Sequence, residues 1–362
     1  MPGTYHQTMY PLALTLLLVG CSGRTVPAAP TGPAPDHFVL EDVRLPGGQA
    51  IAIEIAAGRI VGVDTPASPS VPVVDGHGHY VVPGIIDSHV HLDYLPVAPE
   101  HAQGGVVAAV DLASPLAFVA RPQPLRLLGA GPMVTPVGGY PTLSWGGPTY
   151  GIECATPEQA RAAVRTVRAG GAGIVKVPVS PTDGLTDPLL IAAVDEAHRL
   201  GMPVVAHALT DADAARARAA GVDVLAHTPT QTLSEDTVQA WSDGTVISTL
   251  RAFGGSSAAV DNLRRLRAAG ATVLYGTDLG NTSTPGVDAG ELDLLEAAGM
   301  DAPAILEAMT TAPAGLWGWD DLGRIAVDKA ASLLLVPTDP AVDPSALVGP
   351  ATVYIDGVRV SP

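Results

Sequence analysis

The stretch "VVAHALTDADAARARAAGVDVLAHT", Val204 to Thr228, contains two apolar runs that end in His207 and His227. Short apolar runs predict buried strands, and the Ala- and Arg-rich segment between them predicts a helix over Asp211–Ala220. We expect Asp211 to cap the start of this helix. A strand, a helix and a second strand in this order predict two parallel strands, each with an imidazole at its carboxyl end.

The same alternation runs through the middle of the chain. Predicted strands lie at 106–112, 125–129, 173–177, 203–207, 223–227, 245–250 and 271–278, and the run that ends at His89 brings their number to eight. Further helices are predicted at 157–169, 188–200 and 257–269. Eight strands with intervening helices predict an α/β fold of the (β/α)8 TIM-barrel type. A doubly wound open sheet is the alternative, but no G-x-G-x-x-G follows a strand.

Polar side chains occur where these strands end. In "VVPGIIDSHVHLD", Val81 to Asp93, His89 and His91 face the same way because side chains alternate across a strand. The other candidates are Lys176, His207, His227 and Asp278. Each has an ordinary alternative, as a hydrogen-bonded loop residue or a lysine that reaches solvent. Active groups of a barrel lie at the carboxyl ends of its strands, so their convergence on one rim favours a functional, metal-binding site.

Both ends of the chain read as short strands. The residues from 39 to 82 alternate in β style, and "ASLLLVPTD" and "ATVYIDGVRV" repeat this pattern near the C-terminus. Strands at both ends, with a barrel between them, predict that the termini meet in one small β unit.

The N-terminus predicts export. Pro11 to Gly20, "PLALTLLLVG", is an apolar segment of ten residues, about half of the roughly 20 that a transmembrane helix needs. It is typical of a signal peptide, and Gly20-Cys21 at its end resembles the bacterial lipobox. An ordinary cleaved signal or a short anchor is the alternative, because no Lys or Arg precedes the apolar run.

From this pattern we predict a lipoprotein signal peptide at 1–20, lipidation of Cys21 and a Pro-rich tether at 21–36. The expected location is the bacterial cell envelope, where the lipid-anchored protein faces the periplasm or the exterior. The net charge of −17 argues against a nucleic-acid partner, since phosphates need a basic surface. We expect a small-molecule substrate and membrane contact through the lipid anchor only, and a homo-oligomer stays open.

Several motifs together resemble the amidohydrolase superfamily, in the metal-dependent branch of imidazolonepropionase-like and prolidase-like proteins. They are "VVPGIIDSHVHL", the stretch quoted first, "GATVLYGTDLG" and "LGRIAVDKAASLLLV", and the likeness runs from about Val39 to Val360. The resemblance implies a TIM barrel, here 84–328, beside a small β-sandwich built from 37–83 and 329–362.

The resemblance also implies two divalent metal ions, expected to be zinc. His89, His91 and Asp278 would hold one ion and His207 and His227 the other, with Lys176 bridging them as a carbamate formed with carbon dioxide. A hydroxide shared by the metals would attack a carbonyl, and Asp278 would pass its proton to the leaving amine. Asp87 would orient a histidine or close the strand end.

These features predict a hydrolase that acts on carbon–nitrogen bonds other than peptide bonds, or a dipeptidase-like enzyme. Deaminases of this superfamily bear H-x-x-E after the fifth strand, whereas Ala208, Leu209 and Thr210 follow His207 here. Dipeptides and N-acyl amino acids are the substrates that the resemblance favours. A lactonase or phosphotriesterase on the same binuclear site stays open, as does a non-catalytic metal-binding surface lipoprotein.

Two further residues are candidates for substrate binding. Arg251 follows the seventh strand, and a guanidinium can hold a carboxylate with two parallel hydrogen bonds. Tyr140 lies among glycines after the third strand, and its phenol could donate to the carbonyl oxygen of the scissile bond. A surface arginine and a packing tyrosine are equally simple interpretations.

Overall fold

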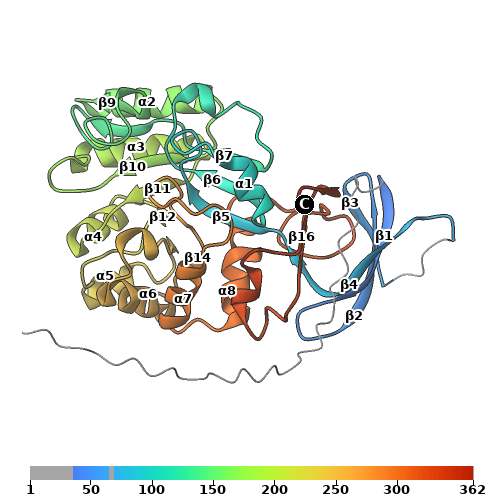
Figure 1. The fold of residues 1–362 in the computed structure, drawn as a ribbon. Helices are drawn as coiled ribbons and strands as arrows, with labels where there is room; N and C mark the ends of the chain where they lie inside the picture. The colour runs from blue at the N-terminus through green and yellow to red at the C-terminus, as the bar shows by residue number, and fades with distance from the viewer. Residues whose placement is uncertain (1–35, 65–68, 362) are drawn as a thin grey trace, which may run out of the picture. The chain divides into compact units, whose positions relative to one another are not determined.

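Eight short parallel strands form the centre of the structure, a computed structural model that describes residues 36–64 and 69–361 (Figure 1). They are β5 (Ile85–Val90), β6 (Val106–Asp111), β7 (Arg126–Gly129), β10 (Val175–Pro178), β11 (Val204–His207), β12 (Val224–Leu225), β13 (Thr245–Ile247) and β14 (Thr272–Leu274). Each predicted apolar run overlaps one of them. Every residue of β5 and β6 is buried, so both strands begin with a run of apolar residues on both faces, and the polar residues are in their carboxyl-terminal parts.

The eight strands are hydrogen-bonded as two sheets, in the orders β5-β6-β7 and β10-β11-β12-β13-β14. Backbone hydrogen bonds also join the outer strands of the two sheets. Gly173 N donates to Gly129 O at 3.2 Å, and three such bonds, among them Asp278 N to His89 O at 2.9 Å, link the end of β5 to the residues after β14. A separate pair, β8 (Met133–Pro136) and β9 (Gly151–Cys154), lies between β7 and β10 in the chain. The arrangement is of the TIM-barrel type, and closure into one continuous sheet stays a prediction.

Helices follow most of these strands (Figure 1). They are α1 (Ala98–Gln103), α2 (Pro157–Ala169), α3 (Asp187–Arg199), α4 (Asp211–Ala219), α5 (Glu235–Ala240), α6 (Ser257–Ala269), α7 (Ala289–Ala297), α8 (Ala302–Met309) and α9 (Thr311–Leu316). The predicted cap of α4 is wrong by one residue, because Thr210 accepts the hydrogen bond from Asp213 N. Asp211 instead accepts hydrogen bonds from the backbone and side chain of Ser234, which links the start of α4 to the start of α5.

Strands from both ends of the chain share a seven-stranded sheet. Its members are β1 (His37–Arg44), β2 (Ala50–Ala56), β3 (Arg59–Val63), β4 (Val73–Pro83), β15 (Leu333–Val336), β16 (Thr352–Ile355) and β17 (Val358–Arg359), in the order β17-β16-β15-β4-β1-β2-β3. Neighbouring strands are about 4.8 Å apart, so a flat sheet would separate β1 and β16 widely. Instead the rings of Phe38 and Tyr354 lie 5.7 Å apart, because the sheet curls over a common core as the two layers of a sandwich do.

One residue separates this sheet from the strand that carries His89 and His91. Gly84 lies between the end of β4 and the start of β5, and its N–H donates to Ser332 O at 2.8 Å. A Cβ at this position would lie 2.2 Å from Val107 Cγ1, so only glycine allows β6 to pass so close. The predicted domain boundary between 83 and 84 coincides with this junction and stays a prediction.

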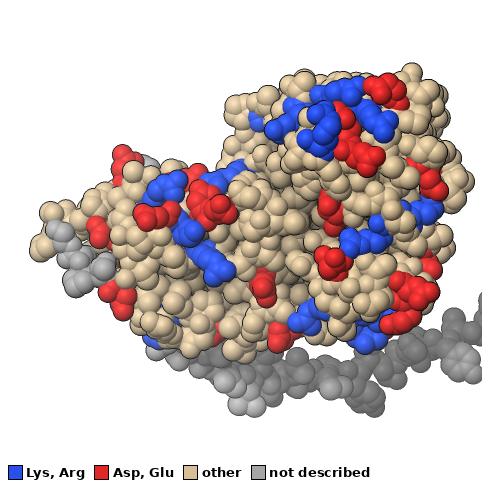
Figure 2. All heavy atoms as spheres, turned by 180° about the vertical axis from the view of Figure 1, so that it is seen from behind, with Lys and Arg blue, Asp and Glu red and all other residues tan. Residues whose placement is uncertain are grey.

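Charged side chains of opposite sign are interspersed on the face drawn in Figure 2. Ion pairs such as Arg165 with Glu158 at 2.8 Å and Arg264 with Asp261 at 2.5 Å lie on the surface. No helix in the described ranges is both long enough and apolar enough to cross a bilayer. The predicted signal peptide, Cys21 and residues 21–35 of the predicted tether lie outside the described residues.

Candidate metal centre

Three predicted ligands form a buried cluster that could hold a metal ion. His89 and His91 come from the end of β5, and Asp278 follows β14. The two Nε2 atoms are 3.3 Å apart, and Asp278 Oδ1 lies 3.4 Å from the Nε2 of His89 and 3.2 Å from that of His91. Each residue is at most 2% exposed, so the cluster is shielded from bulk water.

The orientation of both imidazoles is fixed by backbone carbonyls. Nδ1 of His89 lies 2.9 Å from Ala226 O, and Nδ1 of His91 lies 3.3 Å from Ala113 O. A carbonyl can only accept, so each Nδ1 carries the proton and each Nε2 keeps its lone pair. This is the arrangement that metal-binding histidines adopt in proteins.

The remaining predicted ligands lie beside this cluster. The ring of His227 is 4.6 Å from that of His89, and the ring of His207 is 4.9 Å from that of His227. The Nδ1 atom of His227 lies 3.0 Å from Thr249 Oγ1 and 3.9 Å from Asp278 Oδ2. Lys176, on β10, is 1% exposed, and its register partner on β11 is Val205.

Burial controls the charges of these groups. Burial, followed by the nearby Lys176, holds the pKa of His89 well below its ordinary value and lowers the pKa of His207 to about 4. Burial, followed by His89, holds the pKa of His227 well below its ordinary value. Burial also lowers the pKa of Lys176 to about 7, although Asp278 opposes this shift. Neutral imidazoles and an amine that deprotonates near neutral pH are the forms that metal binding and carbamate formation require.

Asp278 is the anionic member of the set. Burial opposes its ionisation, but His89 and His91 more than compensate and lower its pKa to about 2. Asn281 Nδ2 donates to both carboxylate oxygens at 3.0 Å, a contact that the sequence interpretation missed. Its only signal in the sequence is a polar side chain three residues after the strand-end aspartate.

Two residues of the centre have a strained backbone. Asp278 has a φ of 53° and Thr249 a φ of 41°, in the left-handed region that residues other than glycine seldom adopt. Thr249 is β-branched, so the cost is greatest there. Such strain persists only where surrounding contacts enforce it, and it gathers at functional sites.

Asp87 links the two segments that carry the cluster. Its Oδ1 accepts hydrogen bonds from His89 N at 3.1 Å and Thr277 N at 3.0 Å, and its Oδ2 accepts one from Thr277 Oγ1 at 2.5 Å. His101, from α1, accepts from Gly286 N at its Nδ1 and places its Nε2 3.3 Å from Asp87 Oδ2. Asp87 therefore joins the strand end to the residue before Asp278.

The two predicted substrate residues have different surroundings. Tyr140 stacks on His207, with ring centroids 4.9 Å apart, and its hydroxyl accepts a hydrogen bond from Trp145 Nε1 at 2.7 Å. Arg251 lies in a short 3-10 turn, Arg251–Phe253, and forms an ion pair with the buried carboxylate of Asp288. A substrate carboxylate would therefore share this guanidinium with Asp288.

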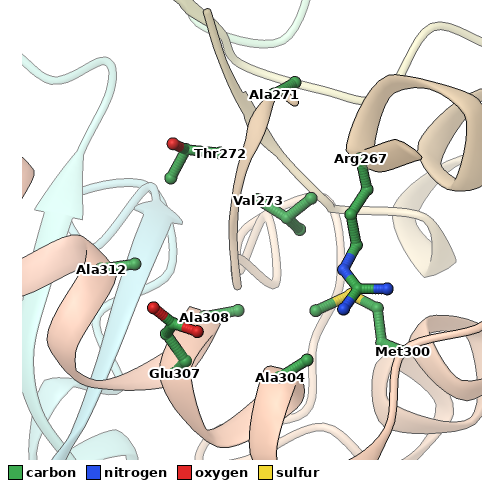
Figure 3. A pocket seen from close by; sticks show the side chains of 9 residues that line it. All are labelled: Arg267, Ala271, Thr272, Val273, Met300, Ala304, Glu307, Ala308 and Ala312. Atoms are coloured by element: carbon green, nitrogen blue, oxygen red, sulfur yellow. The ribbon is translucent and has the colours of Figure 1, made fainter. Parts of the chain in front are cut away.

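A separate pocket contains none of the predicted site residues. Figure 3 shows Arg267 from α6 and Glu307 from α8 reaching toward it, with Met300 and alanines around them. Thr272 and Val273 of β14 line it, whereas Asp278 follows the carboxyl end of that strand. Catalytic groups of barrels gather at the carboxyl ends, so this pocket does not compete with the buried cluster.

Comparison with known families matches residues 123–360, about two thirds of the chain, to the model described as "Amidohydrolase family". The chain belongs to the amidohydrolase family. Four of the predicted ligands lie within the amidohydrolase match: Lys176, His207, His227 and Asp278. His89 and His91 precede it, so their relation to Asp278 rests on the distances given above.

Individual relatives of this amidohydrolase are more distant. N-acyl-D-aspartate deacylase from Alcaligenes xylosoxydans xylosoxydans is 38% identical over 112 residues, which are 27% of this chain and 22% of that protein. The chain thus covers about a fifth or less of the length of the curated relatives that it matches.

Solved structures resemble the amidohydrolase over most of its length. A Xaa-Pro dipeptidase with bound methionine is 21% identical with a TM-score of 0.77, covering 90% of this chain and 100% of that one. A Bifidobacterium longum protein described as a prolidase is 24% identical with the same TM-score, covering 90% and 95%. At this level of identity the likeness concerns the fold, a TIM-barrel-type α/β fold with a sheet-rich N-terminal part.

Proposed function

We propose that the protein is a metal-dependent hydrolase that cleaves an amide bond. The observation that carries this proposal is the buried convergence of His89, His91 and Asp278, whose ligand atoms all lie within 4.8 Å of one another. Membership of the amidohydrolase family supports it. The matches to a deacylase and to dipeptidase-like structures favour amides among the bonds that such a site could hydrolyse.

The donor set suits two divalent ions. His89, His91 and Asp278 would hold one, His207 and His227 the other, and Lys176 would bridge them as a carbamate; we expect zinc, which prefers imidazole and carboxylate ligands. When bound, such ions activate water and polarise a carbonyl oxygen. Two imidazole lone pairs beside a carboxylate, each ring fixed through its other nitrogen, fit this use.

Lys176 is suited to carbamate formation. Its neutral amine would attack carbon dioxide, a new N–C bond would form and one proton would leave, so that the side chain ends in a carboxylate. Burial makes the neutral amine accessible near pH 7, because it lowers the pKa of Lys176 to about 7. A buried ammonium ion would repel the cations instead.

Asp278 and Tyr140 would then act on the reacting atoms. Asp278, ionised and buried, would accept the proton of the attacking water and deliver it to the leaving nitrogen. The Tyr140 hydroxyl accepts from Trp145, so its own proton is free to donate to the carbonyl oxygen of the substrate. Burial raises the pKa of Tyr140 above its ordinary value, which keeps the phenol protonated.

The substrates that we propose are N-acyl amino acids and dipeptides. The enzyme would belong to the hydrolases of carbon–nitrogen bonds other than peptide bonds, or to the dipeptidases. We further propose that lipid on Cys21 anchors it in the bacterial envelope, on the strength of the apolar run that ends there.

The test is to load the full chain with Zn²⁺, measure the bound metal and screen hydrolysis of dipeptides, N-acyl amino acids, lactones and phosphotriesters. Amide turnover should disappear with a chelator and in His91→Ala. His198→Ala is the matched control, because His198 pairs with Asp223 on the surface. If only lactones or only phosphotriesters are hydrolysed, the proposed amide hydrolysis is wrong and the protein is a lactonase or a phosphotriesterase instead. Bound metal without turnover of any class would indicate a binding protein.

A further inference from the structure

Aromatic side chains gather around the candidate metal centre, although the chain holds only 3 Phe, 4 Trp and 8 Tyr among 362 residues. The members of this group are Tyr94, Tyr140, Trp145, Tyr150 and Phe253. An aromatic ring lies 4.8 to 4.9 Å from each of three predicted ligands, His91, His207 and His227. Five of the 15 Phe, Trp and Tyr residues of the chain thus belong to one group around this site.

Trp145 is the centre of this group. Its ring centroid lies 4.8 Å from that of His91, 5.2 Å from that of Tyr94 and 5.4 Å from that of Tyr150. Its Nε1 donates to the hydroxyl of Tyr140 at 2.7 Å. These contacts fix the indole, yet the side chain is only partly buried, so one part of a rigid apolar surface stays accessible beside a predicted ligand.

The segment that carries Trp145 has no charged side chain that could pair with a charged ligand. Residues 133–152 contain no Asp, Glu, Lys, Arg or His. Apolar side chains continue to the surface, where Leu143 is 81% and Val137 66% exposed. The guanidinium of Arg251, by contrast, already faces Asp288. An uncharged group that binds to this surface incurs a small desolvation cost. A carboxylate incurs a large one, and the segment holds no cation that would offset it.

We propose, resting on the amide hydrolysis proposed above, that Trp145 is a specificity-determining residue that binds an apolar or aromatic substituent next to the scissile amide bond. A group that lies against this indole is within ring-contact distance of His91, so it is attached close to the reacting carbonyl. Stacked and edge-to-face contacts with a fixed indole favour flat rings over small alkyl groups.

The kinetic test compares amides that differ by a phenyl in place of a methyl group, such as N-phenylacetyl and N-acetyl derivatives of one amino acid. Trp145→Ala should lower kcat/KM for the phenyl member by about tenfold to a hundredfold more than for the methyl member. The loss of the hydrogen bond to the Tyr140 hydroxyl affects both members, so the ratio of the two kcat/KM values is the readout. Trp145→Phe should retain most of the preference, because it keeps an apolar ring. Thr149→Ala is the control in the same segment, since that side chain is exposed and is not part of the apolar surface.

A binding test needs no turnover. Titration of benzamide and acetamide into the metal-loaded protein should show tighter binding of benzamide, and Trp145→Ala should abolish the difference. Equal benzamide affinity in Trp145→Ala and the unaltered protein, with the same Tm and metal content, would overturn the inference. If no amide is hydrolysed but benzamide binding still depends on Trp145, the proposed function fails, the role of Trp145 in amide specificity falls with it, and only the aromatic binding site at Trp145 stands.

Discussion

At the scale of single residues, Lys176 tests the proposed binuclear centre. Lys176→Ala should abolish hydrolysis and reduce the bound divalent ions from about two to about one per chain, because the bridging anion is lost. A short carboxylic acid added to this variant should restore part of the activity by taking the place of the bridge. Metal content by atomic spectroscopy and kcat/KM are the measurements.

The chain supplies its own control for this change. Lys329 is the only other lysine, and its Nζ donates to Asp320 O at 2.6 Å outside the centre. Lys329→Ala should keep both metal content and activity. One tightly bound ion together with full activity in Lys176→Ala would contradict the binuclear centre.

Arg251 tests carboxylate recognition. Arg251→Ala should lower kcat/KM about tenfold to a hundredfold for a substrate with a free carboxylate and spare its amide-capped analogue, since a charge-assisted contact contributes about 1.5–3 kcal/mol. The variant should also lose thermal stability, because Asp288 would be left buried at 1% exposure without its partner. Equal kinetic losses on both substrates would assign Arg251 to the fold alone.

At the scale of elements, helix α7 carries a buried glutamate that should make the stability of the fold depend on pH. Its Glu291 is buried and accepts hydrogen bonds from Leu250 N at 3.0 Å and Arg251 N at 2.8 Å. Burial nevertheless raises the pKa of Glu291 to about 7. Between about pH 4.5 and 7 the folded state therefore keeps the Glu291 proton, whereas the unfolded state loses it. The stability that comes from this protonated carboxyl group is fully present below about pH 4.5 and is lost as pH rises through about 7.

Replacing the carboxyl group of Glu291 should make the stability of the protein depend less on pH. The unaltered protein should lose stability between about pH 5 and 7, by on the order of 3 kcal/mol if the whole shift is realised. Glu291→Gln cannot ionise, so its Tm should vary less over the same range. Thermal unfolding followed by circular dichroism at several pH values measures both, and parallel profiles would assign the pH dependence to other groups.

The sequence predicted elements better than contacts between them. Helix α2 has the predicted bounds, and α6 ends at Gly270, whose φ of 117° suits glycine. The cap of α4 was misassigned because Asp211 bonds across to Ser234, a contact that local pattern does not contain. The contact of Trp145 with His91 was missed for the same reason, since a residue so far along the chain meets the centre only through the tertiary fold. The contact of Asn281 with Asp278 is local, but a polar residue three positions away is too common a pattern to predict it.

At the scale of the whole molecule, the N-terminal prediction is independent of the fold. Cys21→Ser should release the protein from the membrane fraction or stall its processing, because the thiol is the expected site of lipid attachment. Fractionation of cells that express the full chain, followed by mass spectrometry of the mature N-terminus, measures the outcome. A mature protein that begins at any other residue would rule out the lipobox.

Residue type and spacing in the sequence predicted which side chains meet at the site better than they predicted how the sheets are connected. His89 and His91 come together with Asp278 because neighbouring strand ends meet, as the alternating pattern requires. The alternation predicted a barrel, but its closure stays a prediction, since it depends on long-range contacts such as Gly173 N to Gly129 O and Asp278 N to His89 O. The mixed pairing of β4, parallel to β1 and antiparallel to β15, likewise leaves no local signal.

Because β4 pairs with β15, the seven-stranded sheet can be completed only after the C-terminal part of the chain has been synthesised. On a ribosome, β4 and the strand that bears His89 emerge early, but one edge of β4 has no partner until Leu333–Val336 have been made. A product truncated before this point would expose an open strand edge, the feature that promotes aggregation and attracts proteases. We therefore expect chains that stop before β15 to be removed or to aggregate, and only chains that include it to complete the sheet.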